Sequence, residues 1–476
     1  MARSRVDEIV AACASFAPTL VNGDPETIVT SITHDSRQVR VGTLFCCIKG
    51  EKFDGHDFAL AAVERGAVAL LVQEVITALP VEVPQILVDD SRACLGWAAA
   101  ELYGNPARRL SIVGITGTNG KTTTAHLLAS IMKSAGMQTE VIGTLSGSFT
   151  TPEASDLQKQ LSEMAASGTR VVVMEVSSHA LSLGRVNGTF FAAAVFTNLG
   201  RDHLDFHGSE ENYFQAKARL FSVEFTAVGV INRDDPYGER LLEETLIPTR
   251  SFSIEDIDDV QVSPTEHCYT WNGREIRVGI GGSVNVMNSL AAATVARELG
   301  VGLDEIVAGL DAAPAVPGRF EKIDAGQDFV VLVDFAHTPD GLAEVLRSVR
   351  QSSPESRVIL VFGCGGDRDK MKRPLMGEIA VSLADVVIVT SDNPRSEDPE
   401  AIMSSITAGV PDHMRHRLLA TDVDRRRAIQ RAIGIARPGD VVMIAGKGHE
   451  VTQTIGADTF PFDDRVVAKE ILRSIA

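Results

Sequence analysis

The chain has 476 residues, of which 44% are hydrophobic, and a length of this kind predicts roughly two to four domains. Its 45 Lys and Arg residues against 63 Asp and Glu residues give a formal net charge of −18. So acidic a chain is a poor general binder of nucleic acid or of an anionic membrane, and we expect neither partner. Any anionic ligand must therefore meet positive charge that is concentrated at its site.

The cysteines and the apolar runs indicate the cellular compartment in which the protein works. The six cysteines form no CxxC pair, and the first ten residues, MARSRVDEIV, contain no apolar run. The longest uncharged segment, 278–296, holds Ser, Asn and Thr residues and is too polar to span a membrane. We therefore predict free thiols in a reducing environment, no membrane insertion and a cytoplasmic protein.

Residues 1–103 are predicted to form a small α/β domain. The apolar runs VGTLFCCIKG, AVALLVQ and PQILVDD are typical of buried strands, and FALAAVERG is typical of a helix. Gly104, Asn105 and Pro106 then break the pattern, which indicates a linker.

Residues 104–318 are predicted to form a central α/β domain. The runs LSIVGIT, RVVVMEV, AAAVFTN and TAVGVIN fit buried parallel strands. Helices are expected over 122–135 and over 209–221, the second with Ser209 as its N-cap. Strands that alternate with helices in this way indicate a doubly wound parallel sheet.

Residues 319–476 are predicted to form a third, Rossmann-like domain. The strand-like runs DFVVLVD, RVILVFG, ADVVIVTSD and DVVMIAG alternate with helices expected from Asp340, after Pro374, after Pro399 and over DRRRAIQRAI. The predicted fold class is therefore α/β with three domains, in which a central P-loop-type doubly wound parallel sheet lies between a smaller α/β domain and a Rossmann-like domain.

A glycine-rich loop follows the strand LSIVGIT and opens a helix. Glycines let backbone N–H groups approach phosphate oxygens, and the helix N-terminus adds partial positive charge. Lys121 can reach the β- and γ-phosphates of ATP, and the Thr122 hydroxyl can ligate Mg²⁺. Ile115 stands where the strict P-loop pattern has its first glycine. The expected nucleotide-binding residues are Gly117, Thr118, Asn119, Gly120, Lys121, Thr122 and Thr123.

The segment GITGTNGKTTT closely resembles the nucleotide loop of the Mur ligases, the ATP-dependent amide-forming enzymes of peptidoglycan precursor synthesis. Further matches follow in family order along nearly the whole chain: DSR, TTPE, MEVSSHAL, FTNLGRDHLDFHG, YFQAKARLF, NVMNSLAAA, PGRFE, VDFAHTPD, GCGGDRDK, SDNPRSEDP and AGKGHE. The ordered set resembles the subgroup that adds the third peptide residue. The resemblance implies phosphorylation of a carboxylate by ATP, then attack of an amine on the acyl phosphate.

The resemblance also implies a catalytic and metal-binding set for two Mg²⁺ ions. Glu175, at the end of the strand VVVMEV, would share one ion with Thr122, while His203 would bind the second. Lys217 resembles the lysine that the family carbamylates, which would turn a cation into an anionic oxygen ligand. With Lys121 these are the expected catalytic residues. Without the motifs, Lys217 would be a solvated lysine on an amphipathic helix and His203 an ordinary loop histidine.

Four further residues resemble those that handle ATP between the central and third domains: Asn288, Arg319, Asp334 and His337. An alternative for Asn288 is a helix cap, and an alternative for Arg319 is an interdomain salt bridge.

The muramyl substrate is the second expected ligand. The resemblance assigns the uridine and pyrophosphate part to the N-terminal domain and the peptide part to the central one. The expected residues are His34, Ser36, Glu51, Lys52, Phe53, Thr150, Thr151, Ser177, Leu183 and Arg185.

The acceptor amino acid is the third expected ligand, and DNPR at 392–395 resembles the signature of ligases that add meso-diaminopimelate. That acceptor carries a distal carboxylate which lysine lacks, and a guanidinium such as that of Arg395 can pair with it bidentately. By itself DNPR would be an ordinary Asn-Pro turn. The expected acceptor residues are Arg368, Asp392, Asn393, Pro394, Arg395, Gly446 and Glu450.

Other functions remain open on these residues. The chain could use L-lysine or D-alanyl-D-alanine as its acceptor, or be a folylpolyglutamate synthase, although DNPR and the N-terminal DSR argue against these. It could also be a nucleotide-binding regulator without chemistry, which should have lost Lys121, Glu175, His203 or Lys217; all four are present. We expect a monomer.

Overall fold

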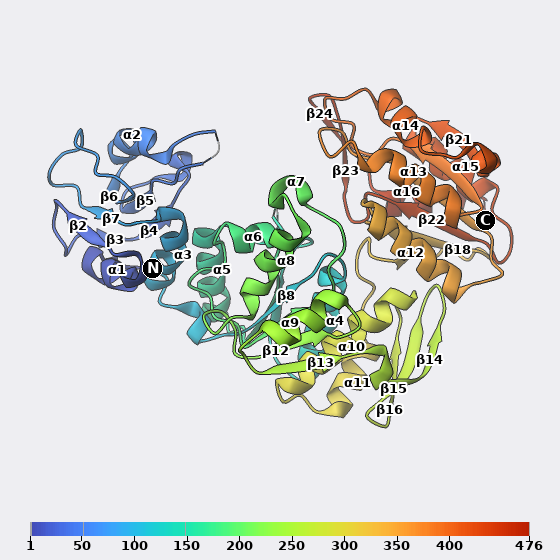
Figure 1. Ribbon diagram of the computed structural model, residues 1–476, viewed down its shortest axis with the longest axis horizontal. Helices are drawn as coiled ribbons and strands as arrows, with labels where there is room; N and C mark the ends of the chain where they lie inside the picture. Colours follow the sequence, from blue (N-terminus) through green and yellow to red (C-terminus); the bar gives the residue numbers. More distant parts are fainter. Residues whose placement is uncertain (1, 51, 148, 476) are drawn as a thin grey trace.

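The computed structural model describes residues 2–50, 52–147 and 149–475, which form three α/β units (Figure 1). The first unit (blue) lies at one end of the molecule, the second (cyan to yellow) in the middle and the third (orange and red) at the other end. None of the helices in these described residues is both long and apolar enough to cross a bilayer. The predicted α/β class with three units is confirmed, whereas the borders at 103/104 and 318/319 stay predictions.

The first unit is built on a five-stranded sheet. Its strand order is β2 (Thr19–Val21), β7 (Gln85–Leu87), β6 (Ala67–Val72), β5 (Thr43–Cys46) and β4 (Ser31–Thr33), parallel except for the edge strand β2. Helices α1 (Val6–Ala12) and α3 (Ser91–Leu102) pack apolar side chains against one face, and α2 (Ala59–Glu64) covers the other. The central strands β5, β6 and β7 therefore contribute side chains to two small cores, one on each face of the sheet.

The central unit holds a six-stranded parallel sheet. The order is β13 (Thr249–Phe252), β12 (Gly229–Asn232), β11 (Ala193–Phe196), β8 (Ser111–Thr116), β10 (Val171–Glu175) and β9 (Thr139–Ile142). Helices α4 (Lys121–Ser134), α10 (Ser283–Glu298) and α11 (Leu303–Asp311) cover one face; α5 (Ala154–Ala166), α8 (Glu210–Ala218) and α9 (Pro236–Glu244) cover the other. The predicted N-cap of α8 is confirmed, because Ser209 accepts a hydrogen bond from the Asn212 N–H. Parallel strands align their carboxyl ends, so the loops after β8, β10 and β11 meet at one edge.

A three-stranded antiparallel sheet in the same unit was not predicted. It consists of β14 (Asp258–Val262), β15 (His267–Trp271) and β16 (Arg274–Val278). Asn272 and Gly273 join the last two strands, and both have positive φ, 50° and 72°. An Asn-Gly pair with this conformation is the preferred two-residue turn of a hairpin, so the sequence did contain a signal for it.

The third unit is a second six-stranded sheet. The order is β17 (Glu321–Lys322), β18 (Val330–Asp334), β22 (Val441–Ala445), β19 (Val358–Phe362), β20 (Val386–Thr390) and β21 (Leu418–Asp422), parallel except for β17. Helices α12 (Pro339–Ser352), α13 (Lys372–Leu383) and α14 (Pro399–Thr407) cover one face; α15 (Arg425–Gly434) and α16 (Asp464–Ile475) cover the other. The helix predicted after Pro374 is present as α13, although it already begins at Lys372. Proline is tolerated there because the first turn of a helix has no partner for its N–H groups.

A fully buried ion pair joins α15 to α16. Arg425 and Asp464 both have side chains that are 0% exposed, and two guanidinium nitrogens each lie 2.7 Å from a carboxylate oxygen. The guanidinium also donates to the carbonyls of Ser391 at 3.3 Å and Ala445 at 3.0 Å. These carbonyls directly precede Asp392 and Gly446, so the pair lies beneath the predicted acceptor loops.

We expect Arg425→Leu to destabilise the third unit by about 3–5 kcal/mol, since it leaves Asp464 buried without its partner. The matched control is Arg426→Leu, on the same helix, whose guanidinium pairs with Glu470 of α16 but is 52% exposed. That change should cost less than about 1 kcal/mol. Differential scanning calorimetry of both variants measures the difference, and equal shifts of the unfolding transition would contradict it.

Candidate active site

The glycine-rich loop after β8 has the shape that its sequence predicts. Gly117 and Gly120 have φ values of 150° and 85°, which L side chains rarely adopt. A Cβ atom at Gly117 would overlap Thr197, and one at Gly120 would overlap Asn288. Helix α4 begins at the next residue, Lys121, so its free N–H groups point into the loop.

This loop forms part of the wall of a cavity of about 630 Å³ that lies between the central and third units. Residues 334–345, which close β18 and begin α12, form the opposite wall. Fourteen of the predicted residues line it: Thr118, Asn119, Gly120, Lys121, Thr122, Thr123, Thr150, Glu175, Ser177, His203, Asn288, Arg319, Asp334 and His337. The structure thus gathers ten of the eleven predicted nucleotide residues, and two of those predicted for the peptide, around one space. Gly117 and the predicted metal ligand Lys217 do not line it.

Thr122 and Glu175 meet inside this cavity. The Thr122 hydroxyl donates to the Glu175 carboxylate at 2.9 Å, and both side chains are buried. The same carboxylate accepts hydrogen bonds from the backbone N–H of Thr144 at 2.8 Å and from its hydroxyl at 3.2 Å. Three donors therefore hold a carboxylate and a hydroxyl oxygen side by side, which is a suitable donor set for Mg²⁺.

Lys217, in the last turn of α8, is 1% exposed, so the alternative of a solvated surface lysine is wrong. Its Nζ donates to the Gly117 carbonyl at 2.8 Å and lies 4.6 Å from the centre of the Tyr213 ring. Lys121 donates to the same Gly117 carbonyl at 2.7 Å. Within the described residues, no carboxylate oxygen lies within 4.0 Å of Lys217 Nζ.

These surroundings disfavour an ammonium at Lys217. Burial chiefly, and then the neighbouring charge of Lys121, hold the pKa of Lys217 well below its usual range. Burial also lowers the pKa of Lys121, although the charge of Glu175 opposes that shift. Of the two amines, Lys217 is thus the one with the stronger tendency to be neutral.

His203 also lies near Tyr213. Its ring centre is 6.1 Å from that of Tyr213 and 4.6 Å from that of His179, and its backbone is left-handed with φ of 53°. Its imidazole lies 3.3 Å from the Asp202 carboxylate. The side chain is 43% exposed, which leaves it accessible from the cavity.

Arg319 reaches the phosphate loop from the third unit. A guanidinium nitrogen donates to Thr122 Oγ1 at 3.2 Å, and the group lies 4.6 Å from the centre of the Phe335 ring. The Nε atom is buried without a hydrogen-bond partner. The alternative of an interdomain salt bridge is wrong, since no carboxylate in the described residues lies within 4.0 Å of the group.

The other predicted nucleotide residues frame the cavity. Asn288 lies in the middle of α10, so the helix-cap alternative is wrong; its Nδ2 donates to Asn285. The buried Asp334 accepts the N–H groups of Phe320 and Ala336, which fixes the loop after β18. Burial raises the pKa of Asp334 and lowers that of His337.

The peptide-side residues adjoin Glu175. Thr151 donates its hydroxyl to the Glu175 carbonyl at 2.9 Å and accepts from the Ser177 N–H at 3.0 Å. Arg185 donates to the Thr151 carbonyl and pairs with Glu153 at 2.7 Å, yet its Nε is buried without a partner. Thr150 contacts the Thr144 hydroxyl at 3.1 Å, and Leu183 ends the short helix α6 (Ser178–Ser182).

The residues predicted for the uridine part lie in the first unit, and none of those described lines the cavity. His34 has a buried Nδ1 without a partner, and Ser36 begins a 3₁₀ turn that Asp35 caps. Lys52 and Phe53 are exposed, Phe53 by 71%. Glu51 lies outside the described residues.

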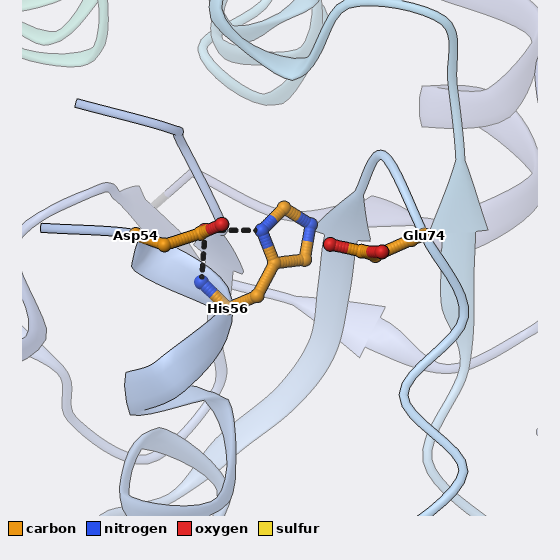
Figure 2. A group of neighbouring side chains, drawn as sticks. All are labelled: Asp54, His56 and Glu74. Carbon is orange, nitrogen blue, oxygen red and sulfur yellow. Dashed lines mark hydrogen bonds and ion pairs between the residues drawn. The ribbon is translucent and has the colours of Figure 1, made fainter. Parts of the chain in front are cut away.

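Next to this loop, Asp54, His56 and Glu74 bring metal-binding atom types close together (Figure 2). Both imidazole nitrogens of His56 are already engaged: Nδ1 lies 2.6 Å from Asp54 Oδ1, and Nε2 accepts the Gln73 N–H at 3.0 Å. Because Nε2 accepts, Nδ1 carries the proton, and no ring lone pair is left for a metal. The group therefore holds the base of the 52–55 loop to β6.

The predicted acceptor residues gather at the carboxyl ends of β19, β20 and β22. Asn393 Nδ2 donates to Glu450 Oε2 at 2.8 Å, and a Cβ at Gly446 would lie 2.7 Å from Asp392 Oδ2. The exposed Arg368 and the half-buried Arg395 flank Gly365, and Pro394 is buried beside them. None of these residues lines the cavity.

Sequence reasoning missed several cavity residues, among them Asn285, Met287 and Glu344. Glu344 of α12 accepts a hydrogen bond from Asn119 Nδ2 of the phosphate loop at 2.7 Å. Burial raises the pKa of Glu344 to about 7. Its position one helical turn after the VDFAHTPD motif was the available signal.

Family models match most of the chain. The Mur ligase middle domain matches residues 115–296, the Mur ligase glutamate ligase domain matches 318–448, and the Mur ligase family catalytic domain matches 28–103.

Curated relatives are similar over nearly the full length. The chain is 44% identical to the UDP-N-acetylmuramoyl-L-alanyl-D-glutamate–2,6-diaminopimelate ligase of Syntrophomonas wolfei, with 95% of this chain and 96% of that protein covered. It is also 44% identical to the ligase of the same name from Streptomyces avermitilis, with 94% and 92% covered.

Solved structures show the same fold. A structure of UDP-N-acetylmuramoyl-L-alanyl-D-glutamate–2,6-diaminopimelate ligase superposes with a TM-score of 0.70 at 33% identity and covers 100% of this chain and 99% of that one. MurF from Acinetobacter baumannii superposes with a TM-score of 0.65 at 20% identity and covers 99% and 98%.

Glu344 gives the stability of the chain a pH dependence. The folded-state pKa of Glu344, about 7, exceeds the ordinary value of 4.5. Its contribution to the stability of the folded chain is therefore complete below about pH 4.5 and is lost as the pH rises through 7. Glu344→Gln should match the wild type at about pH 4 and exceed its stability by about 2–3 kcal/mol at about pH 8. The free energy of unfolding, measured by denaturant titration across this pH range, checks the prediction, with the exposed Glu355→Gln as the control. A difference between Glu344→Gln and the wild type that does not change with pH would contradict it.

Proposed function

The chain belongs to the Mur ligase family, and from this we propose that it is the ATP-dependent ligase that joins meso-2,6-diaminopimelate to the D-glutamate of UDP-N-acetylmuramoyl-L-alanyl-D-glutamate. The observation that carries the proposal is the shared cavity. The phosphate loop, Glu175 and the peptide-side residues Thr150 and Ser177 all line it. The γ-phosphate of ATP and the dipeptide carboxylate would therefore meet in one space.

The reaction has two steps. A carboxylate oxygen of the dipeptide attacks the γ-phosphorus, the bond to the β-γ bridging oxygen breaks, and ADP leaves with that electron pair. The acceptor amine then attacks the acyl carbon; phosphate leaves, and the nitrogen loses a proton to give the amide. The first step brings two anions together, so the charge of Lys121 and exact positioning supply much of the catalysis.

We propose that Thr122 and Glu175 hold one Mg²⁺ ion, because their oxygens already lie 2.9 Å apart in a water-accessible cavity. His203 and Lys217, which both lie near Tyr213, would hold a second. When bound, such ions offset the negative charge between ATP and the carboxylate. Arg319 would add a fixed positive charge, since its buried Nε has no protein partner.

We propose that Lys217 is carbamylated, and its burial beside Lys121 supports this. A neutral amine adds CO₂ to form a carbamate and releases one proton, which yields an anionic oxygen ligand. An ammonium has no lone pair and cannot react. The low pKa of Lys217 therefore favours the modification.

The acceptor pocket would read the distal carboxylate of diaminopimelate through Arg395 and Arg368, which flank Gly365. Asp392 would take the distal ammonium. Asn393 would not bind it directly, because its Oδ1 already accepts hydrogen bonds from Lys447 and from the Thr454 N–H. We also propose that the chain works as a monomer in the cytoplasm.

We expect Lys217→Ala to lose most activity and a short carboxylic acid to restore part of it, because a small carboxylate could supply the missing oxygen ligand. Lys217→Arg should stay inactive, since a guanidinium does not add CO₂. Initial rates of ADP release with and without added acid measure both. Full activity in either variant would exclude a role for the lysine in the reaction.

The function itself is tested by an acceptor comparison. Wild type should form the tripeptide product with meso-diaminopimelate and use L-lysine poorly, since lysine leaves Arg395 unpaired. Losing such a charge-assisted pair costs about 2–5 kcal/mol, so Arg395→Ala should lower kcat/KM for diaminopimelate by roughly 30-fold or more. The feeble lysine reaction and the KM for ATP should hardly change. An equal loss for both acceptors would make Arg395 structural, and wild-type preference for lysine would overturn the proposed acceptor.

A further inference from the structure

Lys447 is a completely buried lysine beneath the predicted acceptor pocket, in the loop that follows β22. Its side chain is 0% exposed. The ammonium donates to three oxygens: Glu450 Oε2 at 3.0 Å, the Thr452 carbonyl at 2.7 Å and Asn393 Oδ1 at 3.4 Å. All three ammonium hydrogens are thus used within the protein. Because Lys447 has no exposed surface, it cannot itself contact the acceptor amino acid.

The contact with Asn393 helps to set the orientation of that amide. Asn393 Oδ1 accepts both from Lys447 and from the Thr454 N–H at 2.9 Å, so a flipped amide would place its NH₂ group against two donors. Nδ2 must therefore point the other way, where it donates to Glu450 Oε2 at 2.8 Å. Lys447, Asn393 and Glu450 form a closed triangle.

Within the described residues, the second carboxylate oxygen of Glu450, Oε1, has no hydrogen-bond partner, and the side chain is 34% exposed. The triangle thus holds one oxygen of the carboxylate and leaves the other free. That oxygen is a suitable acceptor for an ammonium group of an amino acid.

The same lysine anchors the hairpin of β23 (Thr452–Ile455) and β24 (Asp458–Pro461) through the Thr452 carbonyl. This hairpin pairs with the DNPR loop: the Arg395 N–H donates to the Thr454 carbonyl at 3.1 Å, and the Gly456 N–H donates to the Arg395 carbonyl at 2.6 Å. These bonds hold Arg395 at a φ of 51°, a left-handed conformation that is unfavourable for a residue with a side chain.

We propose that Lys447 is a positioning residue for the acceptor amino acid. The Lys447 ammonium holds Asn393, Glu450 and the β23–β24 hairpin in one fixed arrangement. The proposal rests on the proposed function, in which this pocket binds the acceptor. A frame that is set before binding lowers the entropy lost when the acceptor enters, so it acts on acceptor affinity and selectivity rather than on ATP.

The test is Lys447→Met, which has a similar length and no charge. The KM for meso-diaminopimelate should rise about 10- to 100-fold, the loss expected for a hydrogen bond to a charged group. The KM for ATP should stay within about twofold, and the exposed-lysine control Lys469→Met should leave both KM values unchanged. An unchanged acceptor KM, or an equal rise for ATP, would overturn the proposal.

A double-mutant cycle shows whether Lys447 acts through Glu450. If it does, Lys447→Met combined with Glu450→Gln should lower the acceptor kcat/KM no further than the worse single variant. If the fold-losses in kcat/KM of the two single variants multiply in the double variant, the proposal is contradicted. If Lys447→Met does not fold, Lys447→Gln replaces it, and failure of both to fold would make Lys447 a folding determinant and overturn the selective role. A wild type that makes no product with diaminopimelate would instead refute the proposed function.

Discussion

The central constraint at this site is a carbonyl group that two lysines share. Lys121 and Lys217 both donate to the Gly117 carbonyl, at 2.7 and 2.8 Å, and Lys217 is buried with no carboxylate within 4.0 Å in the described part of the chain. Two ammonium groups this close in a poorly hydrated site repel each other, so one amine is driven toward the neutral form. The loop shape that brings them together depends on Gly117, where any side chain would overlap Thr197.

Two parallel sheets divide the chemistry between them. The carboxyl ends of β8, β10 and β11 hold the phosphate loop, Glu175 and the 198–203 loop, whereas those of β19, β20 and β22 hold the residues proposed for the acceptor. Each sheet presents its functional loops at the edge where parallel strands end. Contacts across the units, such as Arg319 to Thr122 and Glu344 to Asn119, join them at the phosphate loop. Since a bond forms between the two substrates, acceptor pocket and cavity must adjoin during the reaction.

The fold was predictable where apolar runs and glycines carried the signal. The strands around LSIVGIT and DVVMIAG and the phosphate loop followed from local pattern, whereas the hairpin at Asn272-Gly273 was overlooked. The site was less predictable, because burial depends on contacts far apart in sequence. Lys217 has the neighbours of a surface-helix lysine along the chain, yet packing of α8 buries it under a loop that lies 100 residues earlier. Glu344 and Lys447 escaped notice for the same reason.

The most direct test is a ¹³C NMR spectrum of the protein in ¹³C-bicarbonate, compared with that of Lys217→Ala. A neutral Lys217 amine that takes up CO₂ predicts one protein-bound carbamate resonance, present in the wild type and absent in the variant. The signal should persist in Lys469→Met, which removes an exposed amine. A wild-type spectrum without a carbamate resonance, or a resonance that survives in Lys217→Ala, would contradict the account.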